Sequence, residues 1–228
     1  MANIRQYTVA LDAALWSNGG QRDSDGVPPR RLDAQEEQPT MGCDMLVALS
    51  RATLNGETLF GHNCNQTGGE SMELVRASGR VFSPGEVVPM GRLLLPQVRR
   101  TWTVLAGRCP GQWGYQHGLN EHGVSAGLTS IGTRPRATEP GLSGPDLVRL
   151  ALERANSARQ AVDVLTDLAS RYGQGEAETD TDPAFLIADG GEALSTLPPA
   201  TTRAKSSLLP SDGHQPRAIA RSASPGDR

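Results

Sequence analysis

The sequence predicts an α+β fold in which strands come first, two helices follow, and strand character then returns. Three observations predict this order. Short apolar runs with strand character follow residue 42, the apolar residues adopt a helical period from 144 to 172, and a further apolar run occupies 184–188. The two helices should form one outer layer over a sheet, because each has a single apolar face to bury.

The first two predicted strands are 45–49 and 58–62. Both are rich in apolar residues, and Asn55-Gly56 between them is a strong signal for a hairpin turn. The later strand candidates each follow or precede turn-forming residues and occupy 73–77, 101–106 and 124–131.

The helical region has recognisable starts and an end. Gly144-Pro145-Asp146 predicts a helix start, because proline is tolerated in the first turn and an acid there faces the positive end of the helix dipole. Ser157 and Gln160 form a capping-box pattern for a second helix, which Gly173 should end. A turn at 189–192 should then reverse the strand that follows the helices.

The two ends of the chain differ from its middle, so the predicted domain is 43–194. Residues 1–42 are polar and without period, and they are either a disordered leader or propeptide, or a mis-annotated start with translation beginning at Met41. Residues 195–228 are rich in Pro, Ser, Ala and Arg. We expect this tail to be out of frame, which would truncate the domain; the alternative is a natural disordered tail.

Composition excludes several classes of function. The 228 residues carry a net charge of −3, with Lys and Arg scattered, so no nucleic-acid partner is expected. No apolar run approaches the ~20 residues of a membrane helix, and secretion by a signal peptide is not expected. Three cysteines without a CxxC pair fit a cytoplasmic protein. No metal or cofactor is expected, because the cysteines and histidines do not have the spacing of metal ligands. The residues considered are Cys43, Cys64, Cys109, His62, His117 and His122.

Cys43 is the most informative residue, because it directly precedes a predicted strand. Cleavage of the Gly42–Cys43 bond would leave a first residue that carries both a thiol and an α-amine, and the amine can accept the proton of its own side chain. This arrangement is typical of N-terminal-nucleophile hydrolases. The alternative for a single cysteine is a buried structural thiol.

Four stretches follow one another in an informative order: 43–49, 55–63, 112–114 with 118–124, and 144–154. Through them, over roughly residues 43 to 194, the chain resembles the secernin and bacterial dipeptidase family of N-terminal-nucleophile hydrolases. The resemblance implies a four-layer αββα sandwich, of which this chain holds about the N-terminal half. It also implies hydrolysis of small amides, above all dipeptides, through an acyl-enzyme.

Three functions therefore stay open. The first is a cytoplasmic dipeptidase whose partners are small-molecule or dipeptide substrates, with a homo-oligomer as a possible assembly. The second is a catalytically silent, truncated homologue. The third is an acylase or acyltransferase, which has the same fold and the same mechanism but differs in the acceptor to which the acyl-enzyme passes its acyl group.

The resemblance also implies site residues. Cys43 takes the nucleophile's place, and Asn120 lies in an Asn-Glu-His-Gly-Val turn like that of the family, where it is a catalytic candidate or purely a turn former. Trp113 is a candidate for the substrate pocket or a packing anchor. Relatives often have an oxyanion-binding asparagine further on, where this chain has Thr129 and Ser130.

The segment after the first hairpin departs from the family. Many relatives have a basic residue, Asn, Ser, Asp and Arg there, whereas this chain has His62-Asn63-Cys64-Asn65-Gln66. His62 can stand for the basic residue, but Asn65 and Gln66 remove a carboxylate and a guanidinium. His62 and Asn65 are therefore candidates for contacts with the nucleophile or the substrate, or they simply end a strand.

Overall fold

The computed structural model describes residues 42–65, 71–90, 93–132, 141–174, 181–197, 207–208 and 217–220. Within these residues the order of elements is strands, two helices and strands, so the predicted α+β class is confirmed. The largest sheet has the strand order β11-β10-β9-β8-β7-β6-β3. Its members are β3 (Glu73–Ala77), β6 (Val104–Arg108), β7 (His117–Asn120), β8 (Ser125–Gly132), β9 (Thr181–Ala188), β10 (Ala193–Thr196) and β11 (Ser207–Leu208).

A smaller sheet has the order β12-β1-β2. It contains β1 (Gly42–Ala48), β2 (Leu59–Asn65) and β12 (Arg217–Ala220), and a separate hairpin joins β4 (Val87–Met90) to β5 (Leu93–Pro96). The helices are α1 (Gly144–Arg154) and α2 (Ala158–Tyr172), and a 3-10 turn covers Ser50–Ala52.

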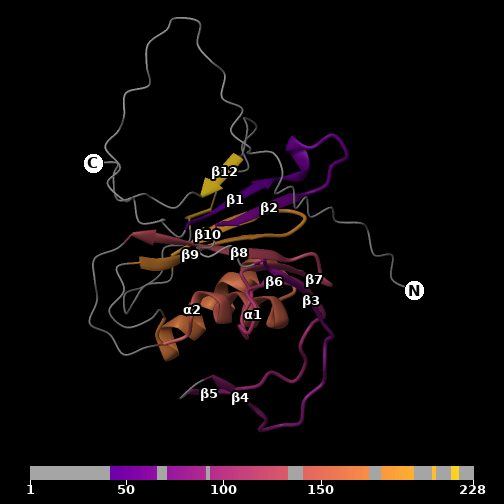
Figure 1. Cartoon of the computed structure of the whole chain (residues 1–228). Coiled ribbons are helices and arrows are strands. Elements are labelled where there is room, and N and C mark those ends of the chain that lie inside the picture. The colour runs from indigo at the N-terminus through magenta and orange to yellow at the C-terminus, as the bar shows by residue number, and fades with distance from the viewer. Residues whose placement is uncertain are drawn as a thin grey trace, which may run out of the picture.

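The elements form three layers in the part of the chain that is described. Figure 1 shows α1 and α2 against one face of the large sheet, and β1 and β2 on the other side of that sheet. The helix side holds the larger apolar core, in which Leu147, Leu150 and Leu165 are fully buried. Helix, sheet and sheet are three of the four layers that the resemblance implies.

A second, smaller core lies between the two sheets. Met45 and Val47 of β1 pack there against Leu186 and Ala188 of β9. Ile187 lies between Leu186 and Ala188 in β9 but belongs to the core on the helix side. Alternate residues of β9 therefore serve different cores, which explains why this strand is apolar without interruption from Phe185 to Ala188.

The predicted first hairpin, the two predicted helix starts and the predicted end of α2 are confirmed. Antiparallel pairing of β1 with β2 runs from Gly42–Asn65 to Ala48–Leu59, and Gly56 has the positive φ of +69° that favours glycine. Ser143 caps α1 through the backbone N of Asp146. Ser157 caps α2, and Gly173 ends it with φ +74°.

The predicted capping box of α2 forms only in part. The backbone N of Gln160 donates to Ser157 Oγ at 3.2 Å, as expected. The side chain of Gln160 instead accepts a hydrogen bond from the backbone N of Asn156, one residue before the cap. A second N–H of the first turn, that of Ala158, donates to the Asp189 carboxylate at 2.8 Å.

Several strands differ from the prediction. β4, β5 and β7 were not expected; β7 reads His-Gly-Leu-Asn, which has little strand propensity and depends on its pairing with β6 and β8. β6 begins at Val104 rather than at 101, because the backbone N of Trp102 donates to the backbone carbonyl oxygen of Glu153 in α1 instead of joining the ladder.

The ends of the predicted domain are described only in part. β10 extends two residues past the expected boundary at 194, and within 195–228 the short strands β11 and β12 pair with β10 and β1. Residues 1–41 lie outside the described residues. The expected nature of both end segments stays a prediction.

The side chain of Asn120 connects the turn between β7 and β8 to the end of α1 through hydrogen bonds. Its side-chain oxygen accepts hydrogen bonds from the backbone N of His122 and Val124, at 3.0 and 3.1 Å. Its side-chain nitrogen donates to the carbonyl oxygens of Leu152 and Ala155, at 2.9 and 2.7 Å. The side chain is only 3% exposed. All of its hydrogen-bonding capacity is therefore used by the backbone, and it also satisfies carbonyl groups at the C-terminal end of α1.

We expect Asn120→Ala to lower the free energy of unfolding by at least about 2 kcal/mol, because it leaves buried backbone groups without partners. Urea denaturation followed by circular dichroism measures the change. Asn63→Ala is the matched control: Asn63 is exposed on β2, so its loss should cost no more than about 0.5 kcal/mol. Equal costs for the two variants would contradict the role given to Asn120.

Candidate active site

Cys43 lies at the interface between the two sheets, near the start of β1. It is on the same side of β1 as Met45 and Val47, which pack on the large sheet. Thr129 of β8, whose side chain is fully buried, contacts it twice. The backbone N of Cys43 donates to Thr129 Oγ1 at 3.3 Å, and Thr129 Oγ1 donates to the carbonyl oxygen of Cys43 at 2.6 Å. One hydroxyl therefore holds both backbone polar groups of Cys43.

Cys64 of β2 lies directly opposite Cys43 in the β1–β2 ladder. The two sulfur atoms are 3.1 Å apart, within reach of a weak S–H···S hydrogen bond. The next pair in the ladder is Gly42 with Asn65. The structure thus confirms that the backbone of Asn65 is close to the start of β1, while its side chain is not among those described.

His62 precedes Cys64 in β2 and lies opposite Met45 of β1. Its ring packs against the ring of His117 from β7. The ring centroids are 4.5 Å apart, and Nε2 of His62 is 3.0 Å from the carbonyl oxygen of Leu128. Gly127 of β8 leaves room for this ring, because a Cβ there would lie 3.0 Å from the Cδ2 atom of His62.

Burial disfavours the charged form of both histidines. Burial lowers the pKa of His62 from its ordinary value, although the Leu128 carbonyl and Asp44 act in the opposite direction. Burial, with His62 close by, lowers the pKa of His117 to about 4. A neutral His62 does not supply the positive charge that the basic residue of relatives provides in this segment.

The other predicted site residues lie on the opposite side of the large sheet. Asn120 contacts α1, and the ring of Trp113 lies 3.9 Å from the guanidinium carbon of Arg149, also in α1. Arg149 donates to the carbonyl oxygen of Trp113 at 2.7 Å. Trp113 therefore has the contacts of a packing anchor. The structure brings Cys43, Cys64, Thr129 and His62 to one interface, and Asn120 and Trp113 to another.

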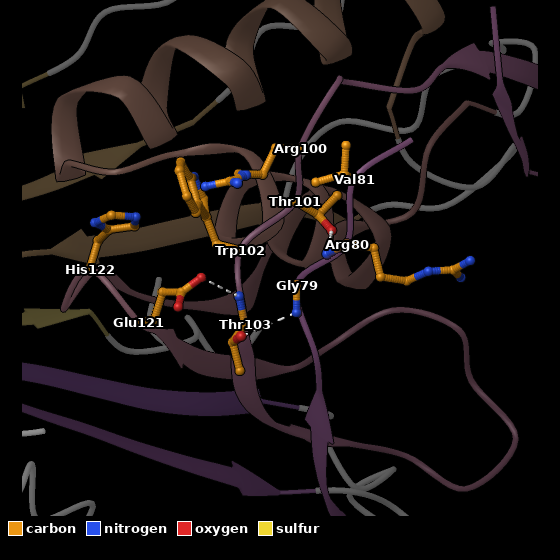
Figure 2. Close-up of a pocket in the computed structure, with 9 residues that line it drawn as sticks. All are labelled: Gly79, Arg80, Val81, Arg100, Thr101, Trp102, Thr103, Glu121 and His122. Carbon is orange, nitrogen blue, oxygen red and sulfur yellow. Dashed lines mark hydrogen bonds between the residues drawn. The ribbon is translucent and has the colours of Figure 1, made fainter. Parts of the chain in front are cut away.

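A polar pocket of about 310 Å³ lies at the far end of the large sheet, where β3 and β7 end and β6 begins. Figure 2 shows Thr103, one of the lining residues, between Gly79 and Glu121: its backbone N donates to the Glu121 carboxylate at 2.9 Å, and its hydroxyl accepts from the backbone N of Gly79 at 3.1 Å. These groups satisfy one another. The lining residues are Gly79, Arg80, Val81, Arg100, Thr101, Trp102, Thr103, Glu121 and His122.

Among the described residues, no three His, Cys, Asp or Glu side chains are grouped so that they would hold a metal ion. The helices in the same part of the chain are too short or too polar to cross a membrane.

The buried histidine pair should make stability depend on pH. Since both pKa values are lower in the folded protein than the ordinary value of about 6.5, protonation favours the unfolded chain. Stability should be fully present above about pH 6.5 and should fall as the pH drops toward about 4. Thermal melts at about pH 7.5 and about pH 5 measure this loss.

His117→Leu should reduce the loss of melting temperature between these two pH values. His122→Leu is the matched control, because His122 is exposed and outside the interface. A pH dependence that is the same in wild type and His117→Leu would contradict the assignment.

Comparison with known proteins gives a family match and several structural likenesses. The model of peptidase family C69 matches residues 117–190. A cysteine-to-alanine mutant of conjugated bile acid hydrolase from Clostridium perfringens is 12% identical, with a TM-score of 0.47, over 82% of this chain and 55% of that one. Penicillin V acylase from Agrobacterium tumefaciens is 14% identical, with a TM-score of 0.41, over 78% of this chain and 49% of that one.

An arginine-to-leucine variant of the Clostridium perfringens hydrolase is likewise 12% identical, with a TM-score of 0.46, over 81% of this chain and 54% of that one. This chain spans about half the length of the solved structures it matches. The family match includes Asn120 and Thr129 but not Cys43. Residues 117–190, from the start of β7 to the turn after β9, thus match peptidase family C69, in agreement with the predicted resemblance to dipeptidases.

Proposed function

We propose that this protein is a cysteine hydrolase that cleaves small amides, with dipeptides as its substrate class, and that Cys43 is the nucleophile once it is the first residue. The observation that carries the proposal is the double contact between Thr129 and the backbone of Cys43. The match to peptidase family C69 supports the peptidase class.

The contact suits an N-terminal nucleophile for a physical reason. The proton of the Thr129 hydroxyl is committed to the carbonyl oxygen of Cys43, so the hydroxyl oxygen can only accept from the nitrogen. After cleavage before Cys43 that nitrogen is an amine. An amine that donates one N–H to Thr129 is restricted in its rotation about the N–Cα bond. Its lone pair can then point toward the thiol of its own residue.

The reaction then follows from the groups of Cys43. Its amine takes the thiol proton, and the thiolate attacks the carbonyl carbon of the substrate amide. The amine returns the proton to the leaving nitrogen, which leaves an acyl-enzyme. Water, with the amine again as base, releases the acid and restores the thiol.

One observation favours the competing proposal of a catalytically silent homologue. Asn65 and Gln66 stand where many relatives have charged side chains, and His62 is neutral at the sheet interface. An acylase or acyltransferase shares every step up to the acyl-enzyme, so it is distinguished only by the acceptor that the acyl group meets.

The intact mass and first residue of the purified protein test the proposal directly. A chain that begins at Cys43 supports the hydrolase and calls for assays with a panel of dipeptides. A chain that retains Gly42 has no α-amine on Cys43, and it would favour the silent homologue.

We expect Cys43→Ala to abolish hydrolysis of any dipeptide that the wild type cleaves, because the attacking sulfur is gone. Cys64→Ala and Cys109→Ala are the matched controls, and both should keep most of the activity. The release of amino acids, followed by amine derivatisation, gives the rates. Activity that survives in Cys43→Ala would rule out this nucleophile.

Thr129→Val should lower kcat/KM by about ten- to a hundredfold, since the side chain keeps its shape but no longer orients Cys43. Thr129→Ser retains the hydroxyl and should recover most of the loss. Thermal melts of both variants separate this effect from unfolding. Equal rates for the Val and Ser variants would contradict the positioning role.

A further inference from the structure

Two thiols face each other at the sheet interface. Cys43 and Cys64 are directly opposite in the antiparallel ladder, and their sulfur atoms are 3.1 Å apart. This is shorter than the contact distance of about 3.5–4.0 Å between packed carbon atoms. The proposed mechanism uses only the first of these thiols.

The backbone between the two residues fits a covalent bond. Directly opposite residues of an antiparallel pair have Cα atoms about 4.5–5.5 Å apart, within the range of about 4.4–6.8 Å found in disulfides. The sulfur atoms would have to approach from 3.1 Å to about 2.05 Å, which rotation of the side chains can supply without breaking the ladder.

Small oxidants can reach this pair. Both side chains are only partly buried, whereas Cys109 is 5% exposed. Cys43 and Cys64 therefore combine accessibility with proximity, and Cys109 lies apart from them with its sulfur 3.5 Å from the side-chain nitrogen of Gln116.

We propose that Cys43 and Cys64 are a site of reversible oxidation, in which Cys64 resolves a peroxide-oxidised Cys43 into an intramolecular disulfide. The order of events rests on the proposed function, because the amine of Cys43 makes its thiolate available to the oxidant. The disulfide removes the nucleophile from catalysis and at the same time protects its sulfur from further oxidation.

The chemistry balances with hydrogen peroxide as the oxidant. The thiolate of Cys43 attacks one peroxide oxygen, the O–O bond breaks, and with one proton the products are a sulfenic acid and water. The thiolate of Cys64 then attacks the sulfur of Cys43, the S–O bond breaks, and hydroxide takes up the proton that Cys64 gave. Sulfur has lost two electrons and peroxide has gained them. A dithiol such as dithiothreitol reverses the reaction by thiol–disulfide exchange.

Peptide mapping of the full chain tests the proposal. The protein is treated with excess hydrogen peroxide, alkylated and digested, and its peptides are analysed by mass spectrometry before and after dithiothreitol. We expect one linked pair of peptides, which contain Cys43 and Cys64 and are lighter by two hydrogen atoms than the sum of the two thiol peptides. Dithiothreitol should return both to thiols. Absence of this linked pair, or links to Cys109 in equal amount, would overturn the proposal.

Variants test the protective role of Cys64. In Cys64→Ser and Cys64→Ala, peroxide should carry Cys43 on to sulfinic acid, so that dithiothreitol no longer restores the thiol. Cys109→Ser is the control and should behave as wild type. If Cys43 is recovered as fully in the Cys64 variants as in the wild type, Cys64 is not the resolving residue. The mapping of the wild type requires no variant to fold.

The two proposals fail separately. A protein that forms the linked peptides but cleaves no dipeptide when reduced would refute the hydrolase and leave the thiol pair intact. A protein that cleaves dipeptides, loses this activity to peroxide and forms no linked peptides would refute the thiol pair alone.

Discussion

The packing of β1 on β8 is the constraint on which the candidate site depends. Both faces of β8 pack against other elements: Ala126 and Leu128 belong to the core on the helix side, while Gly127 and Thr129 face the smaller sheet. Gly127 leaves room for the His62 ring, and Thr129 reaches the backbone of Cys43. A shift of β8 by one residue would exchange these faces and remove the site.

Much of the fold could be predicted from local patterns. Asn55-Gly56 gave the first hairpin, and the caps at Ser157 and Gly173 gave the limits of α2, because turn and cap chemistry is decided within a few residues of the chain. β7 could not be predicted in this way. Its four residues have little strand propensity, and the strand exists because β6 and β8 pair with it on both sides.

The candidate nucleophile could be proposed from the sequence, but its contacts could not. Cys43 was proposed because its position before a strand is a local feature, whereas its contact with Thr129 spans 86 residues of sequence and comes from the packing of two sheets. Asn120 shows the reverse. It lies in a motif that resembles a catalytic family, yet its four hydrogen bonds go to the backbone of its own turn and of the end of α1. Motif spacing alone does not tell on which face of a sheet a side chain lies. The pairing of Cys43 with Cys64 could not be predicted, because a two-residue turn at Asn55-Gly56 sets a different register from the one observed, in which Ala48 pairs with Leu59.

The contacts of Cys43 link the catalytic proposal to the redox proposal. The catalytic proposal depends on the contact between Cys43 and the Thr129 hydroxyl, and the redox proposal depends on the contact between Cys43 and the Cys64 sulfur. The same closeness that lets the Cys43 thiol donate to the Cys64 sulfur would let that sulfur attack an oxidised Cys43. A single pair of opposite residues in the β1–β2 ladder therefore holds both the proposed nucleophile and the residue proposed to resolve its oxidation.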